Sequence, residues 1–396
     1  MMLSLCMIVR DEEATLPRCL ASVAGVADEV IVVDTGSCDH TMQVAQTLGA
    51  QVYTFTWCDD FAAARNESLK YAKGDWILVL DADEVLVPEI VPYLYQGMQQ
   101  ADTIAMTLLR EEVGTNHPYS QLSRLFRKHP AITFARPYHE LIDDSITALL
   151  QHEPHWQITA LPEIAIQHTG YQAAAIEQRK KADRARSIME RYLATHPEDA
   201  YICSKLGALY ADLGDSARGV TLLQQGLQTA TEAPVLYELH YHLGSLYAQL
   251  NEVNQAAQHY QAAIEQPLPQ RLKLGAYNNW GSLLKDQGEL VRAQTLYQTT
   301  IVIDPTFAVG YYNLGLTFKA MGKLKEAIEQ YNRAIQLQPT YAEAHQNLGV
   351  ALLKAGSITE SLEAFQRAIA LYEQQQSPEA GRLREALTGM GLLTTI

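Results

Sequence analysis

Two aspartates, Asp81 and Asp83, directly follow the apolar run at residues 76–80. Side chains alternate in direction along an extended chain, so residues two apart point to the same side. Two carboxylates on one side form a hard-oxygen site that suits Mg²⁺ or Mn²⁺ also held by phosphate oxygens of a substrate. The alternative is an acidic, solvated turn after a strand. We predict a divalent metal site here, with Asp83 as a ligand.

Polar residues also follow two other β-type runs. Arg10-Asp11-Glu12 follows the run at residues 3–9, and Asp34-Thr35-Gly36-Ser37 follows the run at residues 29–33. In open α/β sheets, ligands bind outside the carboxyl ends of the strands. Backbone amides beside a glycine can approach a ligand closely because glycine has no side chain. We therefore expect these residues to gather with the acidic pair at one rim of a sheet.

The elements that would position this rim are short β-runs alternating with helical stretches. This pattern predicts an α/β domain with a mixed, mostly parallel sheet. The expected strands are residues 3–9, 29–33, 51–56 and 76–80, and the expected helices are residues 12–23, 40–48 and 60–72. Each helix lies between two strands, as parallel pairing requires.

The second half of the chain repeats itself with a step of about 34 residues. Gly281, Gly315 and Gly349 keep this step, and an aromatic residue follows each glycine after sixteen residues. Gly207 and Gly244 begin two earlier, slightly longer units. Small residues let the two helices of a pair approach, and we expect the aromatic ring to fill the gap between pairs. The pattern predicts an all-α solenoid of five helix pairs.

The expected division of the chain follows from these two patterns. It comprises an α/β domain at residues 1–170, a helical linker at 171–197, five repeats at 198–372 and a capping segment at 373–396. An amphipathic helix at residues 383–393 is expected to form the cap, because the last unit of a solenoid has an open face.

Composition excludes several classes of function. With 396 residues and 47% apolar content, the chain can fold as two or three globular domains. A net charge of -15 argues against nucleic acid as a partner. Five cysteines without a C-x-x-C pair indicate a reducing compartment, and no run of about 18 apolar residues predicts a transmembrane segment. We predict a cytoplasmic protein. The basic stretch at 176–193 leaves open a peripheral position at the inner membrane face, with a solvated helix face as the alternative.

Three segments carry a family resemblance: LSLCMIVRDEE, EVIVVDTGSCDHT and AAARNESLKYAKGDWILVLDADE. Their order and spacing resemble family 2 glycosyltransferases of the GT-A fold. In that family, the acid matching Asp34 binds the nucleobase, usually uracil, and the arginine matching Arg65 helps hold the nucleotide. The acids matching Asp81 and Asp83 contact the ribose side and the metal.

The resemblance also places the remaining rim residues in the nucleotide site. Arg10, Glu12, Thr35 and Gly36 are expected to line it. Thr35 stands where the family commonly has Asp or Asn, and Arg10-Asp11-Glu12 replaces an aromatic-Asn-Glu sequence. The second half, clearest in YYNLGLTFKAMGKLKEAIEQYNRAIQLQP, resembles tetratricopeptide repeats.

The acceptor side requires a base. In inverting members of the family, a carboxylate beyond the Asp-x-Asp motif takes the proton of the acceptor. We favour Glu140, because it follows the strand-like segment 131–138 and would lie at a strand end. Asp143 and Asp144 are the alternatives for the base. Glu140 would otherwise be a salt-bridged surface acid.

A histidine is expected to complete the metal site. His168 ends an apolar run before Gly170, and some relatives of this fold supply a histidine ligand from this region. Imidazole is a plausible ligand for Mn²⁺ beside carboxylates. His139 is a second candidate, and a histidine that merely joins the domains is the alternative.

The resemblance implies an inverting, metal-dependent hexosyltransferase using Mn²⁺ or Mg²⁺. Its donor would be a nucleoside diphosphate sugar, foremost a UDP-sugar, and its acceptor a protein, a peptide or a glycan. The concave face of the repeats would recruit the acceptor or a partner protein. The alternative is a tetratricopeptide scaffold or adaptor with a degraded transferase domain.

Overall fold

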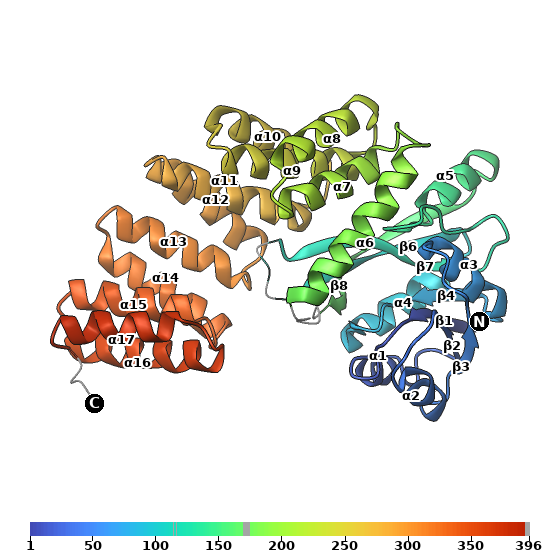
Figure 1. The fold of residues 1–396 in the computed structure, drawn as a ribbon, viewed down its shortest axis with the longest axis horizontal. Coiled ribbons are helices and arrows are strands. Elements are labelled where there is room, and N and C mark those ends of the chain that lie inside the picture. Colours follow the sequence, from blue (N-terminus) through green and yellow to red (C-terminus); the bar gives the residue numbers. More distant parts are fainter. Residues whose placement is uncertain (114, 116, 169–174, 393–396) are drawn as a thin grey trace. The chain divides into compact units, whose positions relative to one another are not determined.

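The computed structural model describes residues 1–113, 115, 117–168 and 175–392, with the backbone alone for residues 175–180 (Figure 1). The chain forms two compact units, Met1–Val235 and Leu236–Ile396. The domain boundaries expected at residues 170, 197 and 372 stay a prediction.

The first unit contains an eight-stranded sheet of order β3-β2-β1-β4-β7-β6-β8-β5. The four parallel strands are β1 (Leu3–Val9), β2 (Glu29–Asp34), β3 (Gln51–Thr54) and β4 (Trp76–Val79). The others are β5 (Glu84–Leu86), β6 (Thr103–Glu112), β7 (Tyr119–Arg127) and β8 (Gln157–His168). β7 is antiparallel to β4 and β6, whereas β6 and β8 are parallel. The mixed, mostly parallel sheet is thus confirmed.

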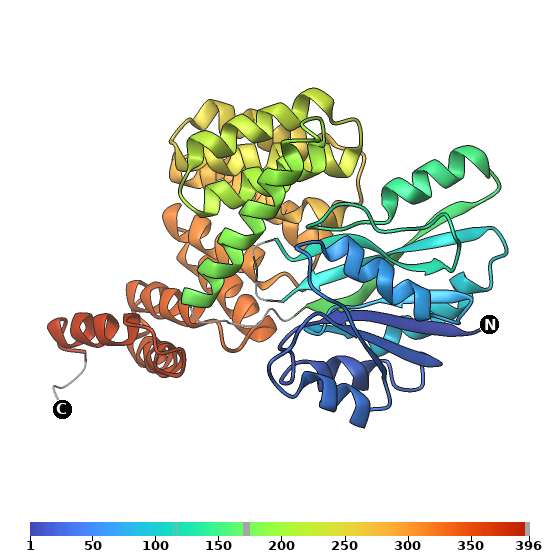
Figure 2. The ribbon, with the colours of Figure 1, turned by 45° about the vertical axis from the view of Figure 1, so that its right-hand side comes forward.

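Helices cover both faces of this sheet (Figure 2). The core on one face contains residues of α1 (Leu16–Ser22), α2 (Thr41–Thr47) and α4 (Val91–Met98). The core on the other face contains residues of α3 (Phe61–Tyr71) and α5 (Asp143–His152). In β1, Leu5 and Met7 belong to the first core and Cys6 to the second. Burial on both faces explains why these strands read as continuous apolar runs.

Three helices complete the first unit: α6 (Ala175–Leu193), α7 (Ala200–Asp212) and α8 (Ser216–Thr229). Met189 and Leu193 of α6 pack with Leu206 and Tyr210 of α7, and Tyr138 from the α/β part joins this cluster. The first helix pair therefore shares a unit with the sheet.

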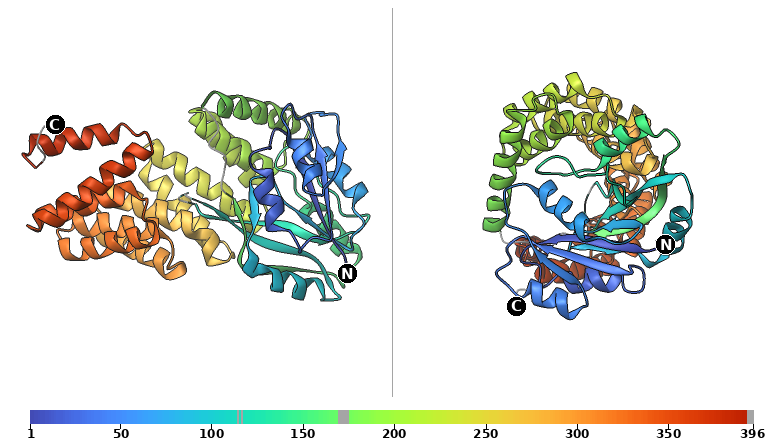
Figure 3. Two further views of the ribbon diagram at one scale, coloured as in Figure 1. Left: turned by 90° about the horizontal axis from the view of Figure 1, so that it is seen from below. Right: turned by 90° about the vertical axis from the view of Figure 1, so that its right-hand side faces the viewer.

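The second unit consists of helix pairs and a final helix, seen again in Figure 3. The helices are α9 (Ala233–Gln249), α10 (Val253–Glu265), α11 (Leu274–Asp286), α12 (Leu290–Ile303), α13 (Ala308–Ala320), α14 (Leu324–Leu337), α15 (Ala342–Lys354), α16 (Ile358–Gln374) and α17 (Glu379–Gly389). The cap α17 packs against α16, and it begins and ends earlier than the expected 383–393. Leu393 lies outside the described residues.

Four of the five repeat glycines are needed because an aromatic ring lies on each of them, whereas Leu223 lies on Gly207. A Cβ atom on Gly315 would lie 2.6 Å from the ring of Tyr331, closer than real Cβ atoms come to other atoms. Gly349 has the same relation to Phe365, at 2.7 Å. The expected close approach is confirmed. The ring packs on the glycine of its own helix pair, and its expected place in the gap between pairs stays a prediction.

Candidate active site

The carboxyl ends of the parallel strands bring Asp34 to the rim, where it ends β2 beside Val9 of β1. Its carboxylate accepts hydrogen bonds from the backbone N–H groups of Gly36 and Ser37, each at 2.9 Å, and from the Ser37 hydroxyl. The Thr35 N–H donates to the Val9 carbonyl at 3.0 Å. The three amides expected to approach a ligand thus bond within the protein. Gly36 is instead required for its φ of 108°, which side chains disfavour.

The loop after β1 lies against this turn. Asp11 accepts from the Cys38 N–H at 2.6 Å, and its own N–H donates to the Ser37 hydroxyl at 2.9 Å. Arg10 is exposed, so its guanidinium is accessible to an anionic ligand. Burial, and then the negative charge of Asp83, raises the pKa of Glu12. The first loop therefore reaches the Asp-x-Asp side of the rim, as expected.

Asp81 lies between two guanidinium groups, that of the buried Arg65 and that of Arg124, whose side chain is 13% exposed. Arg65 pairs with Asp81 Oδ1, and Arg124 donates to Asp81 Oδ2 at 3.0 Å. The Nε of Arg65 donates to Glu140 Oε1 at 2.9 Å. Burial alone would raise the pKa of the Asp81 carboxyl, but Arg124 and Arg65 hold it well below its usual range. Arg65 thereby contacts both Asp81, which is expected to face the nucleotide, and Glu140, the candidate base. The carboxylates of Asp81 and Glu140 both lie beside the Arg65 guanidinium group.

Asp83 contacts His168. The sequence predicted both residues as ligands of one metal, and the structure brings their side chains together. Asp83 Oδ2 lies 3.0 Å from His168 Nε2, and Glu112 Oε2 lies 2.5 Å from His168 Nδ1. The hydrogen bond to Asp83, followed by the bond to Glu112, raises the pKa of His168 to about 10. Without a metal, the imidazole therefore carries protons on both nitrogens at neutral pH.

The sequence did not identify three charged residues of this site, Arg110, Glu112 and Arg124, whereas Glu84 follows Asp83 at the expected rim. Glu84 is fully buried, accepts from the Asp81 N–H at 2.8 Å and pairs with Arg110 at 2.8 Å. Arg110 also pairs with Glu112, at 2.5 Å. A signal was available for Arg110, because it directly follows the largely apolar run at residues 104–109.

The donor atoms at Asp83 and His168 fit a divalent ion. Both side chains are about one quarter exposed, at 28% and 25%. Two ligands at right angles with metal bonds of about 2.1 Å stand about 3 Å apart, which matches the observed 3.0 Å. Within the part of the chain that the structure describes, no three His, Cys, Asp or Glu side chains form a metal cluster. The protein would therefore supply two ligands and leave the other positions to substrate oxygens or water.

The segment before Glu140 differs from expectation. Residues 131–138, all described, form a loop in which Ala135 pairs with Leu141, so the expected strand is wrong. Glu140 reaches the site from this loop through Arg65. The ring of His139 packs near Tyr138 and Tyr201, at 4.9 and 6.5 Å, whereas His168 contacts Asp83. The geometry thus favours His168 as the metal ligand.

The alternative bases have other contacts. Asp143 accepts from the Ser123 hydroxyl at 2.8 Å, and burial raises its pKa. Asp144 is exposed and pairs with Arg136 at 2.5 Å. Of these three carboxylates, Glu140 is the one bonded to Arg65; it forms an ion pair, as the alternative expected, but its side chain is only 12% exposed, so it is not a surface acid.

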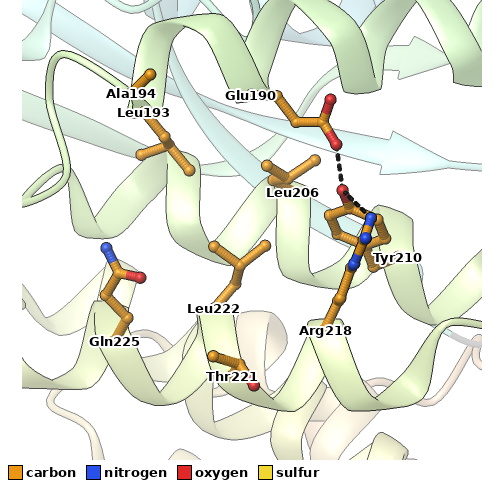
Figure 4. A pocket seen from close by; sticks show the side chains of 9 residues that line it. All are labelled: Glu190, Leu193, Ala194, Leu206, Tyr210, Arg218, Thr221, Leu222 and Gln225. Carbon is orange, nitrogen blue, oxygen red and sulfur yellow. Dashed lines mark hydrogen bonds between the residues drawn. The ribbon is translucent and has the colours of Figure 1, made fainter.

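A cavity of about 390 Å³ lies between α6, α7 and α8 (Figure 4). Leu193, Leu206 and Leu222 line it, and at one end Arg218 donates to the Tyr210 hydroxyl at 3.3 Å. Tyr210 in turn donates to Glu190. The cavity shares none of the residues of the rim.

The comparisons with known proteins agree with the two architectures. The model of glycosyl transferase family 2 matches residues 4–159, and tetratricopeptide repeat models match 204–270, 296–329, 317–356 and 342–375. An α/β sheet with a polar rim, followed by helix pairs, thus defines a glycosyltransferase with a repeat region. Residues 4–159 form a domain of glycosyl transferase family 2, and the chain carries tetratricopeptide repeats after it.

Relatives resemble the chain over different parts. A TPR repeat-containing protein of Synechococcus elongatus is 48% identical over 304 residues, which are 76% of this chain and 75% of that protein. An uncharacterized glycosyltransferase of Rickettsia bellii is 31% identical over 181 residues, which are 43% of this chain and 60% of that protein. The solved structure of YrrB, a TPR protein with an unusual peptide-binding site, matches 47% of this chain and 93% of its own chain, with 18% identity and a TM-score of 0.38.

In the described ranges, no helix is long and apolar enough to cross a membrane.

Proposed function

We propose that this glycosyltransferase is metal-dependent and inverting, and that it moves a hexose from a nucleoside diphosphate sugar, foremost a UDP-sugar. The acceptor would be a protein, a peptide or a glycan recruited with help from the repeats. The observation that carries the proposal is the cluster at the rim, where Asp83 meets His168 and Arg65 connects Asp81 to Glu140.

The donor nucleotide is assigned to the parallel side of the rim. Asp34 would accept from a base N–H, and Asp81 would face the ribose. Arg65 and the exposed Arg10 would face nucleotide oxygens, because guanidinium groups form strong, charge-assisted bonds to phosphate. Glu12, Thr35 and Gly36 would shape the pocket wall. The low pKa of Asp81 supports this role, because its carboxylate stays ionised and able to accept throughout the neutral range.

The cation position is assigned to Asp83 and His168. A bound Mn²⁺ or Mg²⁺ would neutralise the charge that grows on the departing diphosphate, a contribution of several kcal/mol. Asp83 and His168 would hold that ion beside the nucleotide, and their exposure leaves room for phosphate oxygens.

Glu140 would take the proton of the acceptor nucleophile while that nucleophile attacks the anomeric carbon. The bond from this carbon to the nucleoside diphosphate would break on the opposite side. A single displacement of this kind inverts the configuration. A positioned base contributes about 10²- to 10⁴-fold to the rate. Arg65 Nε holds one carboxylate oxygen of Glu140 and leaves the other for the acceptor. The side chain is 12% exposed, so a small part of it remains accessible to a substrate.

The first helix pair would contribute to the acceptor side. Arg136, four residues before Glu140, pairs through Nε with Asp199 at the start of α7 at 2.8 Å. The loop that carries the candidate base is thus fixed to the first repeat within the same unit. This contact supports a role of the repeats in acceptor use.

A thermal-shift panel of nucleotide sugars tests the proposal, because a ligand that binds the folded state raises its stability. We expect one nucleotide sugar to raise the melting temperature in the presence of Mn²⁺, and EDTA to abolish the shift. No shift with any nucleotide sugar would favour the adaptor hypothesis, in which the transferase domain is degraded.

A further inference from the structure

The sheet register places a carboxylate on each side of His168. His168 of β8 pairs with Glu112 of β6 and with Glu84 of β5. Residues that pair across neighbouring strands point to the same face of a sheet. The three residues therefore lie side by side on one face of the sheet, with His168 on the middle strand.

Arg110 contacts the carboxylates of both Glu84 and Glu112. It lies two residues before Glu112 on β6, so it shares the same face. Its Nη1 lies 2.8 Å from Glu84 Oε1, and its Nη2 lies 2.5 Å from Glu112 Oε1. Arg110 thereby holds one oxygen of each carboxylate. The other oxygen of Glu84 accepts from the Asp81 N–H, and the other oxygen of Glu112 contacts His168 Nδ1.

A neutral imidazole has one donor nitrogen and one acceptor nitrogen, and the hydrogen bond at one nitrogen determines which of the two can bind a metal. We propose that Glu112, held by Arg110, is a positioning residue that accepts the Nδ1–H of His168 and directs the Nε2 lone pair to a metal beside Asp83. This inference rests on the proposed function, which places the cation at Asp83 and His168.

The neighbouring residue pair on the same two strands provides a matched control. Glu111 pairs in register with Gln167, and its Oε2 accepts from the Gln167 amide at 3.0 Å. Successive residues of a strand point to opposite faces, so this pair lies on the face away from His168. Replacing Glu111 removes the same charge from the same strand but leaves the contacts of His168 intact.

The experiment is a titration of the full-length chain with Mn²⁺ alone, followed by electron paramagnetic resonance. We expect Glu112→Ala to weaken Mn²⁺ binding by about 10- to 100-fold, the usual effect of losing such a partner. Glu111→Ala should change the Mn²⁺ affinity by less than about twofold, because Glu111 contacts Gln167 on the other face of the sheet. Glu112→Gln should restore part of the affinity, since its amide oxygen still accepts from Nδ1–H.

A spectroscopic signature separates positioning from a general loss of structure. Imidazole nitrogen bound to Mn²⁺ modulates its electron-spin echo, and we expect this signal in the wild type, Glu111→Ala and Glu112→Gln. Wild-type affinity in Glu112→Ala, or loss of the nitrogen signal in a folded Glu112→Gln protein, would overturn the inference. His168→Ala identifies the cause of a failure: if it binds Mn²⁺ like the wild type, the metal position of the proposed function is wrong as well.

Discussion

At the scale of single residues, Arg65 controls two carboxylates with different proposed tasks. It is 2% exposed and bonds to both Asp81 and Glu140. A guanidinium cannot lose its proton in a protein, so Arg65 keeps its positive charge at any working pH. The nucleotide side and the candidate base are thus connected through one rigid, planar group.

Glu140→Gln is expected to lower the rate of sugar transfer by about 10²- to 10⁴-fold, because an amide cannot take a proton at neutral pH. The amide oxygen still accepts from Arg65 Nε, so donor affinity should stay near that of the wild type. Steady-state kinetics and donor titration measure the two effects. Asp144→Asn is the control, because Asp144 is exposed and pairs with Arg136. A larger loss in Asp143→Asn would move the base to Asp143.

The pH dependence of metal binding is expected to follow His168. Its pKa is raised to about 10 by Asp83 and Glu112, so the protonated imidazole stabilises the metal-free fold. That contribution is complete below about pH 6.5 and is lost as the pH rises through about 10. A metal on Nε2 must displace a proton, so affinity should fall as the pH falls. Calorimetry at pH 7.5 in buffers of different ionisation enthalpy should detect close to one released proton. Metal binding without proton release would contradict the assignment.

At the scale of elements, the repeats depend on the contact between a glycine and a ring. Gly315→Ala would place a Cβ atom 2.6 Å from Tyr331, and such overpacking costs about 1–3 kcal/mol. Hydrogen exchange should show reduced protection of α13 and α14. Gly381→Ala in α17 is the control, since its Cβ would meet nothing within 4 Å and alanine favours a helix interior. Equal protection in both variants would refute the packing argument.

The parallel half of the site and the place of His168 could be predicted from sequence, whereas Glu112 and Arg110, the residues that hold His168, could not. Residues 3–9, 29–33 and 76–80 alternate with helices, so a simple topology places Asp34 and Asp81 at one edge. Glu112 and His168 are 56 residues apart, and they pair because β8 inserts between β6 and β5. That strand order leaves no local pattern in the sequence. The loop around Glu140 escaped prediction because its apolar residues resemble a strand.

At the scale of the molecule, the first unit holds the whole candidate site together with one helix pair. We expect a chain that ends at residue 269, without the last three repeats, to retain hydrolysis of the donor. Use of the natural acceptor should fall by about tenfold or more, because a solenoid offers an extended binding surface. Assays of donor hydrolysis and acceptor transfer on both chains make the comparison. Equal loss of both activities would indicate a purely structural role for the repeats.

The central claim is that Asp83 helps hold a cation used in sugar transfer, and release of UDP from a UDP-sugar tests it most directly. The wild type should release UDP with Mn²⁺ and stop when EDTA is added. Asp83→Ala should lower this rate by about 10²-fold or more while the protein keeps its thermal unfolding transition, because a metal supplies several kcal/mol of charge stabilisation. Turnover by Asp83→Ala at the wild-type rate, or undiminished turnover in EDTA, would contradict the account.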